Sequence, residues 1–234
     1  MIRVAAAITL LLAVAMPILA QDVEAPELDH IFNAGTGTLW KADLVGLNAA
    51  LDGAGYPGLP EEILLFGQTG TYGFADGFRV GYVGLSGSAS AFAGERTVRL
   101  NHSLGAGVVE WPISSASPYG LSIGVMLGGG FSTLTLVDHE PPSFEDALLV
   151  PFRAKLDRWF YVVEPSILTY GDLLPGLTIR LRAGYLFTYG CKWRAEEALT
   201  GGSTSHSAGP TIEVSVMLDF ETMIDALLED DEAD

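Results

Sequence analysis

The C-terminal third of the chain contains two segments that alternate strictly between apolar and polar positions. In residues 177–189 every odd position is apolar or aromatic, whereas the even positions include Arg180 and Arg182. In residues 211–220 every even position is apolar, and Glu213 lies among the odd positions. A side-chain period of two places these two sets on opposite faces of a strand. The alternation therefore predicts two β-strands, each with one apolar face and one face that carries charge.

Further segments with strand character occupy most of the chain before them. The chain contains 28 glycines, and this content together with Val, Thr and aromatic residues is typical of strands and turns. We expect an all-β fold, an antiparallel and closed or nearly closed barrel of about 8–10 strands. The triplet Gly128–Gly130 predicts a bend or a bulge, and Pro165 predicts a bulge. The additional strand candidates are residues 63–71, 78–92, 98–112, 120–137 and 159–169.

One segment before these strands has helical periodicity. Leu44, Leu47 and Leu51 share one face if the chain is helical there, and Asp43 can serve near the N-terminus of the helix. We expect a helix over residues 43–54 within an otherwise irregular segment, residues 21–60. The β-barrel domain is expected to cover residues 61–220.

Two architectures fit strands with one apolar face. In a soluble barrel or sandwich the apolar face lines the core, where it can bind a small apolar ligand. In an outer-membrane barrel the apolar face contacts lipid and the charged face lines the lumen. The strands are long and their polar faces are rich in small residues, which favours the membrane barrel. Aromatic residues near strand ends favour it as well; they are Trp111, Trp159, Phe160, Tyr161, Tyr185, Phe187 and Tyr189.

The two ends of the chain differ from the strand-rich part. Residues 1–20 contain a basic start, an apolar core and Ala20 before a polar Gln21, which is typical of a cleavable secretory signal peptide. Residues 221–234 contain seven acids and no base, and we expect a solvated acidic tail there. The protein is therefore expected to be exported, to the outer membrane or otherwise to the periplasm or the exterior. The single Cys191 excludes a disulfide within the chain.

Residue types that support catalysis or bind metals are scattered. The histidines, at positions 30, 102, 139 and 206, have no metal-ligating neighbour at the usual spacing. His102 lies beside Ser103, but adjacent strand residues face opposite ways. The formal net charge of −17 argues against nucleic acid and against a bare anionic membrane surface as partners. We therefore expect no catalytic site, no metal and no cofactor, and membrane lipid as the partner.

A charged network is expected inside the barrel. If residues 159–169 and 177–189 form a hairpin centred near residue 173, antiparallel pairing sets Glu164 opposite Arg182. Pairing of this kind avoids the cost of unpaired buried charge. The network could either fill the lumen or select what passes through it. Its predicted members are Glu164, Arg180, Arg182 and Glu213.

Several stretches resemble known exported proteins. Residues 48–51, the run Gly55-Tyr56-Pro57-Gly58-Leu59-Pro60 and then Phe66-Gly67 look like uncharacterised exported bacterial β-barrel-like proteins. The run Val162-Val163-Glu164-Pro165, then Pro175-Gly176-Leu177 and the aromatic strand to Tyr189, resembles a late hairpin of small outer-membrane β-barrel proteins. This resemblance spans most of residues 40–220. It implies a fold and an envelope location, and no functional residues.

The sequence therefore predicts an outer-membrane β-barrel with a structural, adhesive or pore-like role and without catalysis. The alternative is a soluble exported β-barrel or sandwich that binds a small apolar ligand. A lipid-modifying barrel enzyme is the least favoured hypothesis, since a serine–histidine site also needs a third group and an oxyanion hole.

Overall fold

The computed structural model describes residues 31–73, 78–114, 119–138, 153–174, 176–190, 192–195 and 206–218. Within these ranges the chain forms eight β-strands and one α-helix. The helix is α2 (Val45–Gly53), and the strands are β1 (Ile31–Lys41), β2 (Glu62–Gly73), β3 (Arg79–Ala93), β4 (Arg96–Ser114), β5 (Tyr119–Val137), β6 (Arg153–Leu174), β7 (Leu177–Gly190) and β8 (Ser207–Leu218). The predicted signal peptide 1–20, the acidic tail 221–234, Cys191, His30 and His139 lie outside the described residues.

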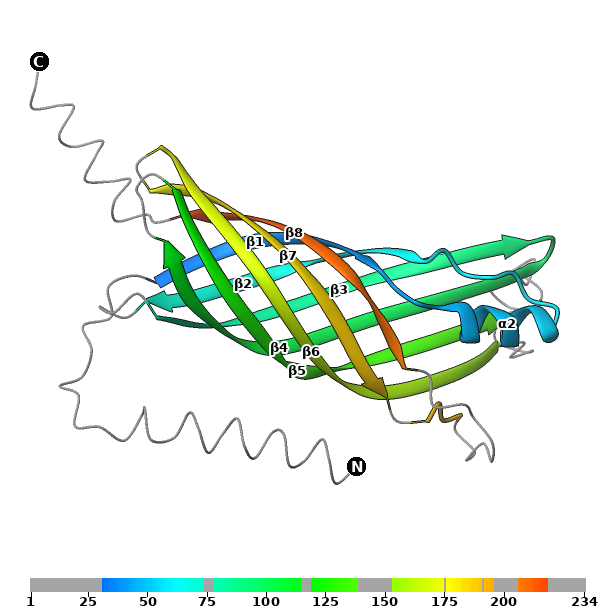
Figure 1. Ribbon diagram of the computed structural model, residues 1–234. Helices are drawn as coiled ribbons and strands as arrows, with labels where there is room; N and C mark the ends of the chain where they lie inside the picture. Colours follow the sequence, from blue (N-terminus) through cyan, green and yellow to red (C-terminus); the bar gives the residue numbers. More distant parts are fainter. Residues whose placement is uncertain are drawn as a thin grey trace, which may run out of the picture.

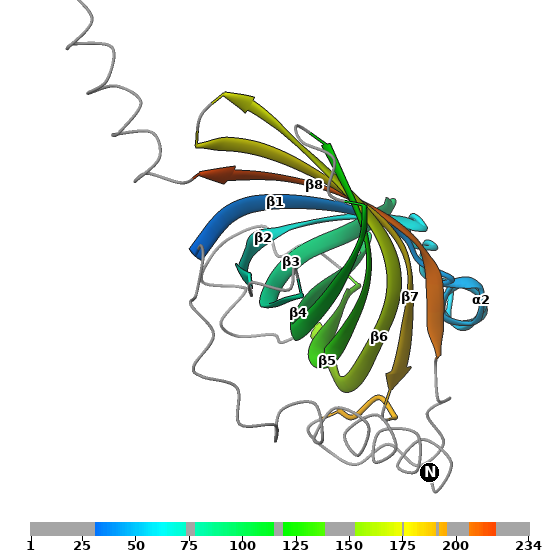
Figure 2. The same cartoon turned by 60° about the vertical axis from the view of Figure 1, so that its left-hand side comes forward.

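The strands form one closed barrel (Figures 1 and 2). Each strand pairs antiparallel with its neighbour in sequence, and β1 pairs antiparallel with β8 to close the sheet. Closure leaves no strand edge unpaired, so backbone hydrogen bonding is satisfied around the whole circumference. The predicted closed antiparallel barrel with one short N-terminal helix is confirmed, with eight strands.

Strand β1 corrects the expectation that residues 21–60 are irregular outside the helix. It pairs with β2 over its whole length and with β8 from Asn33 onward. Within it Thr36 and Thr38 are buried inside the barrel, whereas Gly35 faces outward. Because neither face of this strand is strongly apolar in its first half, its period of two gives no hydrophobic signal in the sequence.

The apolar faces of the last two strands point outward, and the charged faces point inward. On β7, Leu181 is 45% exposed whereas its neighbour Arg182 is 1% exposed. On β8, Ile212 is 59% exposed and Glu213 is 1% exposed. Large apolar side chains are exposed on the other strands too, and they include Leu39, Leu64, Phe66, Tyr82, Trp111, Ile123, Trp159, Tyr161 and Ile167. The apolar faces therefore do not line a core, as the soluble alternative required.

The interior has two chemically distinct halves. The half near α2, called here the apolar interior, is filled mainly by Trp40, Ile63, Leu65, Leu85, Leu100, Leu104, Leu134, Phe160 and Leu186. The other half, called here the charged interior, contains Glu110, Glu164, Arg180, Arg182 and Glu213 among buried threonines and serines. Both halves are enclosed by the same eight strands.

Strand β5 has no bulge at its glycine triplet. Gly128–Gly130 pairs without a register shift with both β4 and β6. A side chain at Gly128 would collide with the backbone of Gly105 and with Ala106 on β4. The glycines therefore permit close approach of neighbouring groups.

The bulge expected at Pro165 is also absent from the β6–β7 pairing. Val163 pairs with Phe187 and Ser166 pairs with Gly184, so the register is the same on both sides of the proline. The proline side chain faces outward on β6. A strand can thus carry proline here without changing which residues face the lumen.

Helix α2 lies at one end of the barrel (Figure 1). It is slightly shorter than the predicted helix 43–54, and Asp43 Oδ1 accepts a hydrogen bond of 3.2 Å from the Val45 amide. Leu51 is buried within the apolar interior cluster. The Asn48 side chain donates to the Leu59 carbonyl at 2.9 Å and accepts from the Leu59 amide at 2.8 Å. These bonds hold the helix against the chain that leads into β2.

The two ends of the barrel carry connections of different length. At the end where β1 begins and β8 ends, the strands are joined through residues 74–78, 115–118 and 175–176. At the opposite end, the connections are residues 42–61, 94–95, 138–152 and 191–206. All connections at this second end except residues 94–95 are long. Short connections at one end and mostly longer ones at the other are typical of outer-membrane barrels.

Candidate functional site

Arg182 lies at the centre of the charged interior. Strands β7 and β8 pair it directly with Glu213, and its Nη2 forms an ion pair with Glu213 Oε2. Its Nε lies 3.6 Å from Glu164 Oε1 on β6. All three side chains are at most 2% exposed. One guanidinium group therefore links acids from the strands on both sides of its own.

Hydroxyl groups also donate hydrogen bonds to the same two carboxylates. Thr211 Oγ1 donates to Glu164 Oε1 at 3.0 Å. Thr38 Oγ1 donates to Glu213 Oε2 at 3.3 Å, and Ser215 Oγ donates to Glu213 Oε1 at 3.0 Å. Because Thr38 belongs to β1, the hydrogen-bonded network extends from β6 across the closing seam of the barrel.

A second ion pair crosses the lumen. Arg180 Nη2 lies 2.5 Å from Glu110 Oε1, and both side chains are almost completely buried. Strands β7 and β4 are not neighbours in the sheet, so this contact spans the interior. Arg79 pairs with Glu110 across β3 and β4, and its guanidinium lies 4.4 Å from the ring centroid of Tyr170. With Arg79 included, three arginines and three glutamates meet here and their formal charges balance.

The structure brings the four residues predicted from the sequence into this one cluster and adds two that sequence reasoning missed. Glu110 and Arg79 lie on strands far from β7 in the sheet, so pairing rules for one hairpin could not find them. The available signal was a charge at the lumen-facing position near the end of the predicted strand 98–112, where Glu110 follows a run of small and apolar residues.

The predicted register of the β6–β7 hairpin is wrong. In the strand pairing, Arg182 lies opposite Leu168 on β6. The residue expected opposite it was Glu164, which lies four positions earlier on the same strand. Strand β6 continues to Leu174, and the chain reverses at Gly176, where φ is 75°. The long arginine side chain spans the offset and still reaches Glu164.

Burial makes these charges depend on one another. An ion taken out of water loses several kcal/mol of hydration, and partners must replace it. Nε and Nη1 of Arg180, and Nη1 of Arg182, donate to no group in the described part of the chain. Side chains that lined an open water channel would be exposed, whereas these are almost completely buried. The cluster therefore closes the lumen at this level.

A histidine–serine pair lies in the apolar interior. His102 Nδ1 is 2.9 Å from Ser132 Oγ, and the imidazole stacks on Phe160 with a centroid distance of 4.5 Å. Trp40 packs on the same ring at 5.0 Å. Both members of the pair are buried, and Ser103, the serine adjacent in sequence, faces outward. A serine enclosed in this way is closed to substrate, so the pair is a polar contact within the packing.

Among the residues that the structure describes, no group of three or more His, Cys, Asp or Glu side chains is arranged to hold a metal ion. In the described ranges no helix is long and apolar enough to cross a membrane.

The fold is similar to crystal structures of Ail, the attachment invasion locus protein of Yersinia pestis. One match is 13% identical, covers 80% of this chain and 95% of that chain, and has a TM-score of 0.43. The second is Ail in complex with the heparin analogue sucrose octasulfate; it is 12% identical, has the same coverage of both chains and has a TM-score of 0.46. No family model and no curated protein matches the sequence.

The arrangement as a whole is that of a small outer-membrane β-barrel. The exterior is apolar, the interior carries paired charges, and the strands close without a free edge. Chemically, the charged interior can hold the strands in register and block the lumen.

Proposed function

We propose that this protein is an integral outer-membrane β-barrel that serves as a closed, non-catalytic anchor with a structural or adhesive role. The observation that supports this proposal is the inverted polarity of the barrel. Leu181 and Ile212 are exposed on the outside, and Arg182 and Glu213 are buried inside. In water the outer apolar surface would promote aggregation. In lipid it is the favourable surface, and the closed sheet satisfies every strand edge.

The connections set the proposed orientation. The end with short connections would face the periplasm, and the end with residues 42–61, 138–152 and 191–206 would face the exterior. Any adhesive contact would then be made by that outer end, where α2 is held by Asn48 and Leu59. Arg96 adds a further tie, because its Nη1 donates to the Gly55 carbonyl at 2.7 Å and its Nε bonds Asp138 Oδ1 at 2.9 Å.

The first experiment is fractionation of expressing cells, followed by an alkaline wash of the envelope pellet. We expect the full chain to remain in the washed membranes, and to migrate faster on electrophoresis without heating than after boiling, because the closed barrel resists unfolding in detergent. Release into the wash would contradict the membrane location. It would return the soluble ligand-binding β-barrel or sandwich as the working hypothesis.

A second experiment separates the closed anchor from a pore. Purified protein is reconstituted in a planar lipid bilayer and the current is recorded under applied voltage. We expect no stable channel, because Arg180, Arg182 and their glutamate partners fill the lumen. Stable, stepwise conductance in the unmodified protein would replace the anchor with a pore-like role.

A further inference from the structure

We propose that the outer wall formed by β4, β5 and β6 contains a binding groove for one membrane lipid with an anionic, phosphate-bearing headgroup. The inference rests on the proposed membrane location and goes beyond it, because it assigns a specific lipid site to one wall of the barrel. The wall contains a hollow of about 490 Å³. Pockets for small ligands have volumes of roughly 300–1,000 Å³.

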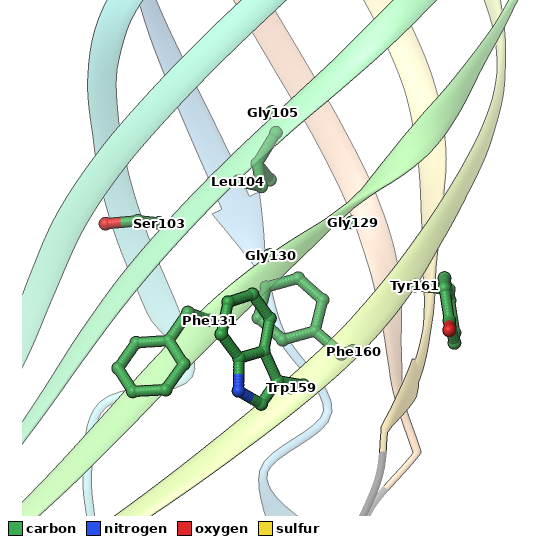
Figure 3. Close-up of a pocket in the computed structure, with 9 residues that line it drawn as sticks. All are labelled: Ser103, Leu104, Gly105, Gly129, Gly130, Phe131, Trp159, Phe160 and Tyr161. Carbon is green, nitrogen blue, oxygen red and sulfur yellow. The ribbon is translucent and has the colours of Figure 1, made fainter.

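The hollow opens to the outside of the barrel (Figure 3). Trp159 and Tyr161 line it and are 66% and 68% exposed. Leu104 and Phe160 also border it, but their side chains are buried in the apolar interior. Because inward and outward positions alternate along a strand, these two residues contribute their backbone to the bottom of the hollow.

Strand register gives the hollow aromatic walls and a glycine floor. Ser103, Phe131 and Trp159 are direct cross-strand neighbours, and the Phe131 and Trp159 rings meet edge to face with centroids 5.2 Å apart. The next outward row is Gly105, Gly129 and Tyr161. Two glycines side by side leave bare backbone between aromatic side chains. A flexible acyl chain can lie on this floor and contact the rings.

A basic rim lies above the aromatic row. Arg99, Thr135 and Lys155 form one outward row, four residues from Ser103 (99 to 103), which corresponds to about 13 Å along a strand. Asp157 lies between this rim and the aromatic row. It accepts a hydrogen bond of 2.8 Å from Thr133 Oγ1 and forms an ion pair with Lys155 Nζ at 3.5 Å. Arg194 joins the rim through its backbone bridge to Asp157.

The rim is locally positive on a strongly acidic chain. In the part of the chain that the structure describes, Arg99, Lys155 and Arg194 lie around Asp157, so basic side chains outnumber acidic ones on these rows, whereas the whole chain has a formal net charge of −17. An amphiphile whose acyl chain occupies the glycine floor would place its headgroup at this rim. A headgroup with a net negative charge matches this rim, since each basic residue near a membrane surface attracts anionic lipid.

A second copy of the chain fits the groove less well than a lipid. In a two-fold dimer the same surface patch meets itself. The basic rim of one barrel would then face the basic rim of the other. Charge repulsion therefore opposes this occupant, whereas it favours an anionic lipid.

The test is native mass spectrometry of the full chain in detergent during titration with phosphatidylglycerol or phosphatidylcholine. We expect one phosphatidylglycerol to be retained at concentrations where phosphatidylcholine is not. Gly105→Leu fills the floor, and no atom lies within 4 Å of a Cβ at this position, so the fold tolerates it. We expect this variant to bind about tenfold more weakly.

Two further variants separate the parts of the groove. Gly35→Leu is the matched control, because Gly35 is an outward glycine on β1 with the same free space around a Cβ; its lipid retention should equal that of the unmodified protein. Arg99→Gln and Lys155→Gln should each weaken phosphatidylglycerol binding about fivefold and leave phosphatidylcholine unaffected.

Equal retention of both lipids, or equal loss in Gly35→Leu and Gly105→Leu, would overturn the lipid site. Dimers that disappear in Gly105→Leu would assign the groove to self-association instead. Alkaline extraction is repeated for every variant. If every variant stays in the washed membranes but the unmodified protein shows no preference for phosphatidylglycerol, the lipid site is contradicted. The proposed membrane anchor then still holds.

Discussion

The two halves of the barrel interior are packed by different physical means. The apolar interior is held by side chains such as Trp40, Leu65 and Phe160, whose contributions are largely local and roughly proportional to buried area. The charged interior is held by ion pairs, in which Arg182 stabilises the barrel only while Glu164 and Glu213 are present. The same closed sheet can therefore enclose either chemistry, provided that every buried charge has a partner.

The difference also separates two tasks. Apolar packing near α2 holds the outer end of the barrel, where the longer connections begin. The charged cluster joins β1, β4, β6, β7 and β8, so it fixes the register of strands on both sides of the closing seam. Substitutions in the two halves should consequently differ in whether a second substitution can restore stability.

The largest effect is expected for Arg182→Ala. It leaves Glu164 and Glu213 buried without their cation, and loss of one partner of a buried pair typically costs about 3–5 kcal/mol. Urea unfolding of the reconstituted barrel measures the change in unfolding free energy. The exposed Arg194→Ala is the control and should change it little.

A compensating variant tests whether the charges act as a set. Arg182→Met combined with Glu164→Gln and Glu213→Gln removes the cation and both acids together. We expect it to recover most of the stability lost in Arg182→Ala. If the triple variant is as unstable as the single one, the charged interior is not a mutually dependent cluster.

The next largest effect is expected for Leu65→Ala in the apolar interior. Leu65 is completely buried, and truncation of a buried leucine costs about 3 kcal/mol. Leu64→Ala, one residue away on the outer face, should cost much less, because lipid chains replace the lost contacts. Equal losses for the two variants in the urea experiment would show that the outer face is packed against protein and not against lipid.

The smallest effect is expected for Thr38→Val. It removes the hydrogen bond from Thr38 Oγ1 to Glu213 Oε2 but leaves the Arg182 pair in place, so the loss should be about 1 kcal/mol. The same unfolding assay measures it, and Thr36→Val on the same face provides a comparison. A loss as large as that of Arg182→Ala would mean that β1, and not the ion pair, holds Glu213.

Local sequence was sufficient for the strands whose two faces differ strongly. The alternation in residues 177–189 and 211–220 correctly separated an apolar face from a charged one, because side-chain direction along a strand has a period of two whatever the strand contacts. It was insufficient for β1, where alternating glycine and threonine present no hydrophobic contrast. It did not distinguish a bulge at Gly128–Gly130 from close packing, and the structure shows unbroken pairing there with close contacts to the neighbouring strands.

Sequence by itself therefore determined the strand character of the chain, the composition of each strand face and the identity of four charged residues bound for one polar face. Tertiary structure alone decided that β1 closes the sheet against β8 and that Glu110 meets Arg180 across the lumen. The reason is physical. The direction of a side chain relative to its own strand is a local property, whereas register and contacts across the lumen depend on where distant strands end and how the barrel closes.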